Sequence, residues 1–337
     1  MNIKENFLNA LNGKECEKTP VTAFPSVLTV ELLQRANTSF DEACHDAEKM
    51  AEVASSLYEY TGIEGITIPL DLWFEAESFN HIVERQEGTL TPVVTEAPYS
   101  SPEDIKIPDD FVCKGQFPTI EKAAKIIHDK YDDKNVPVIG EVTGAFTILT
   151  DLVDLGKVIK MLNSDYLEID DALEEINDVL IDEIKFYEDI GVDCIVVNDP
   201  SSTARILKPE LFDDLVKPYL VELSSTMNVP GVLHICGDTN SNLENMLSCG
   251  YEGLSISQEV DITHAREIKE KIGSNSVICG NISIGELLLK SVDEVKMESV
   301  KCLDKNVDIL GPSCNIAYET PLNNIKAMVE ARNEYFG

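Results

Sequence analysis

One histidine and two cysteines of this chain have the types and positions needed to bind a single metal ion. His234 and Cys236 stand two positions apart in the run VPGVLHICGD, and Cys314 ends the run VDILGPSC. Residues that alternate along a β-strand project from the same face, so an imidazole nitrogen and a thiolate sulfur at this spacing can reach one ion. One His and two Cys leave a tetrahedral Zn2+ with one open position, which is typical of a catalytic site.

The His-x-Cys pair alone is a weak signal, because such residues more often pack in a core. Its position favours a site: His234 follows the apolar run PGVL and precedes a Gly-Asp pair, and Cys314 ends Gly-Pro-Ser-Cys, so both lie where a strand opens into a loop. The nine cysteines are odd in number and no secretion signal precedes them, so a disulfide framework is not expected. The other cysteines are expected in the core or without partners, and the other histidines at the surface: Cys16, Cys44, Cys113, Cys194, Cys249, Cys279 and Cys302, and His45, His81, His128 and His264.

The thiolate-rich ligand set indicates which reaction the metal would support. Hydrolytic zinc usually has His and carboxylate ligands, whereas two thiolates donate more negative charge and make the metal a poorer Lewis acid towards water. Such a site suits an exogenous thiol, which loses its proton on coordination and becomes a nucleophile at neutral pH. The pattern therefore predicts attack of a thiolate sulfur on an electrophilic methyl group.

The elements that position these residues are predicted from hydrophobic periodicity. Nearly continuous apolar runs are typical of parallel strands covered on both faces, and eight occur, at 21–25, 65–70, 136–142, 193–200, 229–238, 251–260, 276–282 and 307–314. Helical spacing lies between them, at 40–60, 167–190, 207–227, 263–273, 291–306 and 320–336, with Pro218 predicting a kink or break.

This alternation predicts an α/β fold, a TIM (β/α)8 barrel with an N-terminal extension and an irregular insertion at 71–135 after the second strand, formed by residues 1–337 as one domain. A doubly wound open sheet is the alternative, but no glycine-rich phosphate-binding motif follows any strand. Function in a barrel lies at the C-terminal ends of the strands. Because strands five and eight are not neighbours, at least one loop must lean across the mouth to bring Cys314 to His234.

Charge and composition exclude several partners. The chain has 61 Asp+Glu against 27 Lys+Arg, a net charge of −34, so it repels nucleic acid and anionic lipid. No run approaches the roughly 20 apolar residues that cross a membrane, and the N-terminus has no signal peptide, so a cytoplasmic location is expected. The acidic surface serves solubility, or reflects a cytoplasm rich in salt.

Together these residues resemble the methylcobamide:coenzyme M methyltransferases, which belong to the uroporphyrinogen decarboxylase superfamily. The resemblance rests on the H-x-C…C set, on the Asp-Pro at 199–200 followed by ILKPELFDDLVKPYL, on the ending GPSCNIAYETPLNNIKAMVEA, and on GIEGITIPLDLWFEAESFN at 62–80. It implies a TIM barrel, a Zn2+ held by His234, Cys236 and Cys314, coenzyme M as the methyl acceptor, and a methylated corrinoid protein as donor and partner.

The resemblance also implies catalytic roles near the metal. Some members of this family have a carboxylate near the end of the sixth strand that can occupy the open metal position before a thiol binds. Here the neighbourhood reads Ser257-Gln258-Glu259, so Gln258, Glu259 or neither serves. Asp199 corresponds to an aspartate over the barrel mouth, or it caps the turn at Pro200.

Cofactor contacts are assigned by position at the strand ends. Arg205, with Lys208, is a candidate for binding the sulfonate of coenzyme M, and Asn281 is a second candidate for cofactor binding.

Three other functions are alternatives. Uroporphyrinogen decarboxylation is disfavoured, because the stretch PVTAFPSVLTVELLQRANTSF has only Arg35 and an Arg-poor acidic chain is a poor host for a polyanion. A cobalamin-independent methionine synthase-like transfer to homocysteine would use similar ligands. A non-catalytic module that binds the corrinoid protein is the third, and the intact His and Cys set disfavours it.

Overall fold

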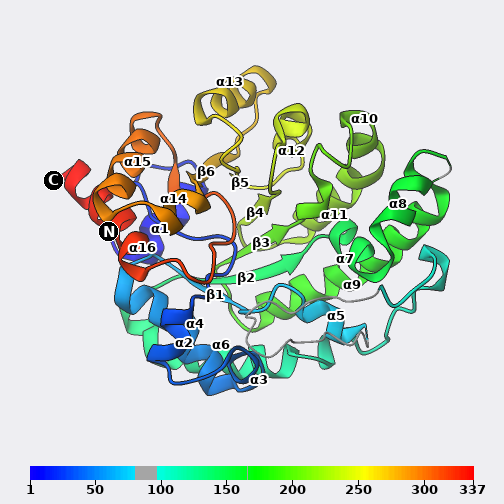
Figure 1. Ribbon diagram of the computed structural model, residues 1–337, viewed down its shortest axis with the longest axis horizontal. Helices are drawn as coiled ribbons and strands as arrows, with labels where there is room; N and C mark the ends of the chain where they lie inside the picture. The colour runs from blue at the N-terminus through cyan, green and yellow to red at the C-terminus, as the bar shows by residue number, and fades with distance from the viewer. Residues whose placement is uncertain (80–96, 165) are drawn as a thin grey trace.

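The strands form one curled parallel sheet at the centre of the molecule. The structure, a computed structural model, describes residues 1–79, 97–164 and 166–337. Its seven strands lie side by side in chain order: β1 Ile66–Ile68, β2 Val138–Thr143, β3 Cys194–Asn198, β4 Gly231–His234, β5 Gly253–Ser255, β6 Val277–Ile282 and β7 Ile309–Pro312. Helices surround this sheet, and both termini lie on one side near α1, α15 and α16 (Figure 1). The expected α/β fold is confirmed in its parallel, curled sheet of TIM-barrel type, with strands in chain order.

The first of the eight predicted strands is not a strand. Val21 makes a single bridge to Leu310 of β7, where Thr22 N donates to Leu310 O at 2.9 Å and Leu310 N donates to Pro20 O at 2.9 Å. On its other side, Glu64 N donates to Val21 O at 2.7 Å, just before β1. Pro20 and Pro25 flank the run and have no N–H to donate to a ladder, which is why pairing stops after one bridge.

A buried ion pair holds this bridging segment in place. Arg332 and Glu64 are 1% and 7% exposed, and their charged groups pair at 2.7 and 3.2 Å. Arg332 Nη1 also donates to Thr19 O at 2.7 Å, and Val21 N donates to Glu64 Oε2 at 3.1 Å. The C-terminal helix is therefore tied through one ion pair to the segment that lies between β7 and β1.

The helices include all six predicted helical stretches, two of them broken, and several more that the sequence did not predict. They are α1 Ile3–Leu11, α2 Val30–Arg35, α3 Phe40–His45, α4 Ala47–Thr61, α5 Phe74–Ser78, α6 Phe117–Tyr131, α7 Ala145–Leu152, α8 Leu155–Leu162, α9 Leu167–Asp189, α10 Pro209–Leu211, α11 Lys217–Thr226, α12 Leu243–Leu247, α13 Ile262–Ile272, α14 Ile284–Leu289, α15 Val292–Asp304 and α16 Leu322–Phe336. Short 3-10 turns lie at Pro102–Asp104, Phe111–Cys113, Asp132–Lys134, Pro200–Ser202 and Asn240–Asn242. In the described part of the chain, none of these helices has the length and apolar character needed to cross a membrane.

Both breaks have a local cause. Asp46 ends α3 and begins α4, because its carboxylate accepts from Glu48 N and Lys49 N. The predicted kink near Pro218 is a π-helical turn, Phe212–Val216, between α10 and α11. Pro218 has no N–H for the regular ladder, and the wider turn just before it absorbs the mismatch. The stretch 71–135 lies between β1 and β2 and contains the regular helix α6; residues 80–96 within it lie outside the described residues.

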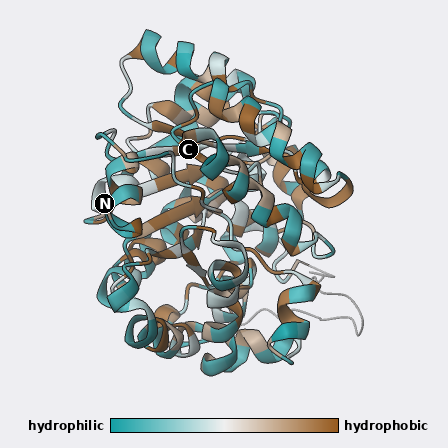
Figure 2. Cartoon of the chain, turned by 90° about the vertical axis from the view of Figure 1, so that its left-hand side faces the viewer, coloured by the Kyte–Doolittle hydropathy of each residue, from teal (hydrophilic) through white to brown (hydrophobic). Residues whose placement is uncertain are grey.

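The inside of the curled sheet is filled by apolar side chains and closed at one end by α1. A compact inner cluster joins helix α1 to the strands, through Phe7, Ala10, Leu11, Phe24, Ile139, Cys194, Val196, Val232, Val277, Cys279 and Ile309. Figure 2 shows hydrophobic residues gathered in the central strands and hydrophilic ones on the surrounding helices. With this end packed, the polar residues of the sheet collect at the other end, where the strands finish.

Candidate metal centre

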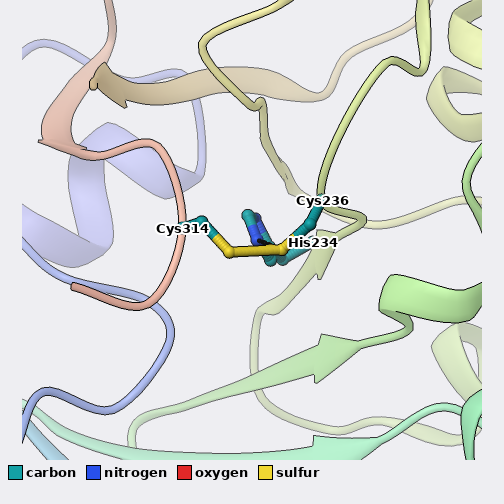
Figure 3. Close-up of side chains that lie close together, drawn as sticks. All are labelled: His234, Cys236 and Cys314. Atoms are coloured by element: carbon teal, nitrogen blue, oxygen red, sulfur yellow. Dashed lines mark hydrogen bonds between the residues drawn. A yellow bond between two sulfur atoms is a disulfide. The ribbon is translucent and has the colours of Figure 1, made fainter. Parts of the chain in front are cut away.

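The three predicted ligands converge where the strands end. His234 is the last residue of β4, Cys236 follows it, and Cys314 lies just beyond β7. One ligand atom from each lies within 4.8 Å of the other two, and Cys314 reaches the pair from the opposite side (Figure 3). Strands β5 and β6 separate β4 from β7, so the loop that carries Cys314 leans across the mouth, as the sequence required. The α-carbons of the two cysteines are 6.2 Å apart.

The His234 ring is oriented so that one nitrogen is available to a metal. Nδ1 lies 3.1 Å from Ser255 O and 3.0 Å from Ser255 Oγ. Because a carbonyl oxygen only accepts, Nδ1 carries the proton, and Nε2 keeps its lone pair 3.0 Å from Cys236 Sγ. Burial lowers the pKa of His234 to about 4, so the imidazole is neutral at pH 7, which is the form that ligates metals.

Cys236 and Cys314 are joined by a disulfide in this structure, which differs from the expectation of free thiols. The two strand-end loops bring their sulfur atoms to the same place, and a disulfide is the oxidised form of such a pair. Two-electron reduction yields two thiolates beside His234 Nε2. The reduced set, one imidazole nitrogen and two thiolate sulfurs, fits Zn2+ by number and type of donor.

The remaining cysteines and histidines largely follow expectation. Cys44, Cys194, Cys249, Cys279 and Cys302 are buried, Cys16 is half-buried and Cys113 is exposed. His45 and His264 are exposed, whereas His128 is half-buried and lies 3.1 Å from Ile190 O; His81 lies outside the described residues. The part of the chain that the structure describes has one His/Cys/carboxylate group suited to a metal, the group predicted.

Asp199 is fully buried at the first turn of α7, outside this group. Its Oδ1 accepts from Thr147 N at 2.8 Å and from Thr147 Oγ1 at 2.5 Å, and its Oδ2 accepts from Ser202 Oγ at 2.5 Å. Burial raises the pKa of Asp199, and these three hydrogen bonds oppose that rise. Both oxygens are therefore engaged in fixing α7 and the turn after β3, the capping arrangement that the sequence left open for this residue.

Gln258 and Asn281 both make hydrogen bonds to the chain, and the contact of Gln258 lies next to one of the three donors. Gln258 Oε1 accepts from Ser313 Oγ at 3.1 Å, next to Cys314. Asn281 Nδ2 donates to Ser257 O at 2.9 Å and to Val260 O at 2.7 Å. Neither amide belongs to the group of three donors.

The charged candidates lie at the surface of the mouth. Arg205, Lys208 and Glu259 are exposed. The pKa of the nearby Asp238 carboxyl is lowered, mainly by side-chain and backbone hydrogen bonds from Asn240 and in smaller part by the charge of Arg205. Arg205 therefore stands close to the loop that follows Cys236.

The structure adds two residues that the sequence analysis did not select, Ser255 and Glu141. Glu141 is 3% exposed; its Oε2 accepts from Ser26 N at 2.8 Å and its Oε1 accepts from Asn198 Nδ2 at 3.2 Å. Asn198 pairs in register with His234 on the neighbouring strand. A lone carboxylate inside the apolar run VPVIGEV was the available signal, because an acidic residue is rarely buried without a role.

The pH dependence of stability should contain a contribution from Glu141. Burial raises the pKa of this carboxyl to about 7. The folded chain then holds a proton that the unfolded chain releases from about pH 4.5, so the stability is full below that pH and is lost as pH rises to about 7. We expect Glu141→Gln to reduce the loss in unfolding free energy between pH 5 and pH 8 by about 3 kcal/mol.

Urea denaturation at the two pH values measures this effect. The exposed Glu121→Gln variant is the control and should keep the wild-type dependence on pH. An unchanged pH dependence in Glu141→Gln would contradict the raised pKa.

The chain is similar to known proteins over nearly its full length. Residues 2–335 match the family model described as uroporphyrinogen decarboxylase (URO-D). The methylcobamide:CoM methyltransferase MtaA of Methanosarcina barkeri is 32% identical, over 99% of this chain and 98% of its own length. The methylcobamide:CoM methyltransferase MtbA of Methanosarcina acetivorans is 29% identical, over 98% of each chain.

A solved structure gives the same result at the level of the fold. A methyltransferase from Methanosarcina mazei superimposes with a TM-score of 0.94 at 31% identity, covering 100% of both chains. The resemblance inferred from the motifs is therefore confirmed. The chain belongs to the uroporphyrinogen decarboxylase family, and within that family it is a methyltransferase.

Proposed function

We propose that this chain transfers a methyl group from a methylated corrinoid protein to the thiol of coenzyme M, with Zn2+ bound by His234, Cys236 and Cys314. The observation that carries the proposal is the convergence of these three donors at the open end of the sheet. The Methanosarcina relatives, whose names state this activity, support it along the whole chain. Residues 1–337 act as one catalytic domain in this proposal.

The residues of the chain prepare the site for a thiol. The Ser255 carbonyl holds the His234 ring through Nδ1–H, so that Nε2 faces the two sulfurs. His234 is fully buried and both cysteines are half-buried, so the site is only partly exposed to water. Bound Zn2+ would lower the pKa of an incoming thiol, so that the thiol is deprotonated at neutral pH. The thiol proton passes to solvent.

The deprotonated thiol is the nucleophile in the methyl transfer. The sulfur of coenzyme M attacks the methyl carbon in line, a new S–C bond forms, the Co–C bond breaks, and the corrinoid leaves as Co(I) with the bonding electron pair. The donor is a bulky group on another protein, and the mouth where the strands end is the face that must admit it. Arg205 is our candidate for the sulfonate of coenzyme M, because it is exposed beside the loop after Cys236.

A methyl-transfer assay with free methylcobalamin tests the function. The reduced protein should methylate coenzyme M, a chelator should stop the reaction, and added zinc should restore it. Faster methylation of homocysteine than of coenzyme M would favour the methionine synthase-like alternative. Zinc bound at one per chain with neither thiol methylated would favour the non-catalytic corrinoid-binding module.

A further inference from the structure

One short segment, residues 255–260 at and after the end of β5, contacts the surroundings of all three donors. Ser255 receives the His234 Nδ1–H. Ser257 Oγ donates at 2.5 Å to the carbonyl of Gly237, the residue after Cys236. Gln258 Oε1 accepts from Ser313, the residue before Cys314, at 3.1 Å. We call residues 255–260 the β5 segment.

Asn281 fixes this segment from the neighbouring strand β6. Its Nδ2 uses both N–H groups, one on Ser257 O at 2.9 Å and one on Val260 O at 2.7 Å. These two carbonyls flank Gln258, and Val260 N donates back to Ser257 O at 3.1 Å to close the turn. The turn that presents Ser257 and Gln258 is therefore held at both of its ends by one amide.

The strand order explains why a segment that links the three donors is needed. The donors come from β4 and β7, and β5 and β6 lie between them, so no direct strand pairing sets the distance from Cys314 to the other two. The β5 segment spans this gap, with one hydrogen bond towards each loop. Hydrogen bonds that orient metal ligands typically change metal affinity or activity by about 10–100-fold.

We propose that Asn281 is a positioning residue. Its two hydrogen bonds to the carbonyls of Ser257 and Val260 fix the β5 segment, an arrangement that we call the clamp, and the clamp sets the spacing of the three donors before any metal binds. Its amide acts on the chain rather than on substrate. For the metal itself, the inference rests on the proposed zinc-dependent function. Its geometric content, the closeness of Cys236 and Cys314, is testable without metal.

The chain offers a matched control for the Asn281→Asp variant. Asn324 also uses Nδ2 on two backbone carbonyls, Leu287 O and Lys290 O, each at 2.8 Å, but at the end of α14 and away from the donors. Asn281→Asp and Asn324→Asp each remove the same two donor groups and keep the size of the side chain. A loss common to both variants is structural, and a loss confined to the first comes from the clamp.

Two measurements decide the proposal. The first is the equilibrium between the Cys236–Cys314 dithiol and a glutathione redox buffer in metal-free protein, which reports the effective concentration of one thiol at the other. The second is the zinc dissociation constant by competition with a chromophoric chelator. We expect Asn281→Asp to lower the effective concentration about 10-fold and to weaken zinc binding about 10–100-fold, with Asn324→Asp close to wild type in both.

Each outcome supports or overturns one claim. Equal behaviour of the two variants in the thiol measurement overturns the clamp, whatever zinc does. Wild-type protein that binds no zinc overturns the proposed function and leaves the thiol measurement to decide the clamp. If Asn281→Asp fails to fold, Ser257→Ala replaces it, because it removes only the bond to Gly237 O; an unchanged effective concentration in that variant overturns the clamp.

Discussion

Replacing Cys314 with serine should weaken zinc binding and slow methyl transfer to coenzyme M by more than about 100-fold, because a lost ligand costs more than a lost hydrogen bond to a ligand. A serine hydroxyl stays protonated at neutral pH, so the site loses one of its two thiolates and one negative charge. His234 and Cys236 sit on the same strand end and keep their places. Zinc per chain and the initial rate with methylcobalamin measure the two effects.

The control for this variant is a cysteine outside the group of donors. Cys113 is exposed and belongs to no metal group among the described residues, so Cys113→Ser should retain both zinc and rate. A Cys314→Ser protein that methylates coenzyme M at the wild-type rate would contradict the ligand assignment.

Replacing Arg332 with methionine should destabilise the fold by about 3–5 kcal/mol, because breaking a buried ion pair leaves an uncompensated charge. Glu64 is 7% exposed, and its carboxylate accepts two hydrogen bonds from the Arg332 guanidinium and one from Val21 N. The same guanidinium holds Thr19 O, so the variant also loosens the segment that lies between β7 and β1. Urea denaturation measures the loss.

An exposed pair of the same type provides the comparison. Arg35 and Glu31 pair at 2.8 Å with about two fifths of each side chain exposed, and Arg35→Met should cost less than about 1 kcal/mol. The double variant Arg332→Met with Glu64→Gln should recover part of the loss, since it removes the unpaired charge. Equal costs for Arg332→Met and Arg35→Met would contradict the role given to the buried pair.

Much of the fold could be predicted because the strands are covered on both faces. Seven of the eight apolar runs are strands, and the long helix at 167–190 is observed as α9, Leu167–Asp189. The prediction of a strand at 21–25 was wrong. The run is as hydrophobic as a strand, but the prolines at its two ends stop the hydrogen-bond ladder after one bridge. The apolar content of a run predicts that the run is buried. Strand pairing additionally requires backbone N–H groups that are free to donate hydrogen bonds.

The candidate metal ligands could be predicted because their residue types combine with their positions at the ends of strands. A His-x-Cys at one strand end and a Cys at another predict a donor set, and the structure brings the three side chains together. The supporting residues could not be found in the same way: serine, glutamine and asparagine are common, and Ser255, Gln258 and Asn281 gain their roles from partners far away in sequence. Gln258 and Asn281 are predicted from their position at strand ends, and the structure shows both in hydrogen bonds to the chain.

X-ray absorption at the zinc K-edge tests the central claim most directly, because it counts the sulfur atoms bound to the metal. The reduced, zinc-loaded protein should show two sulfur ligands and one imidazole nitrogen, from Cys236, Cys314 and His234. Adding coenzyme M should raise the sulfur count to three, as its thiol takes the open position. Zinc that binds without sulfur ligands, or a sulfur count that stays at two with saturating coenzyme M, would contradict the account.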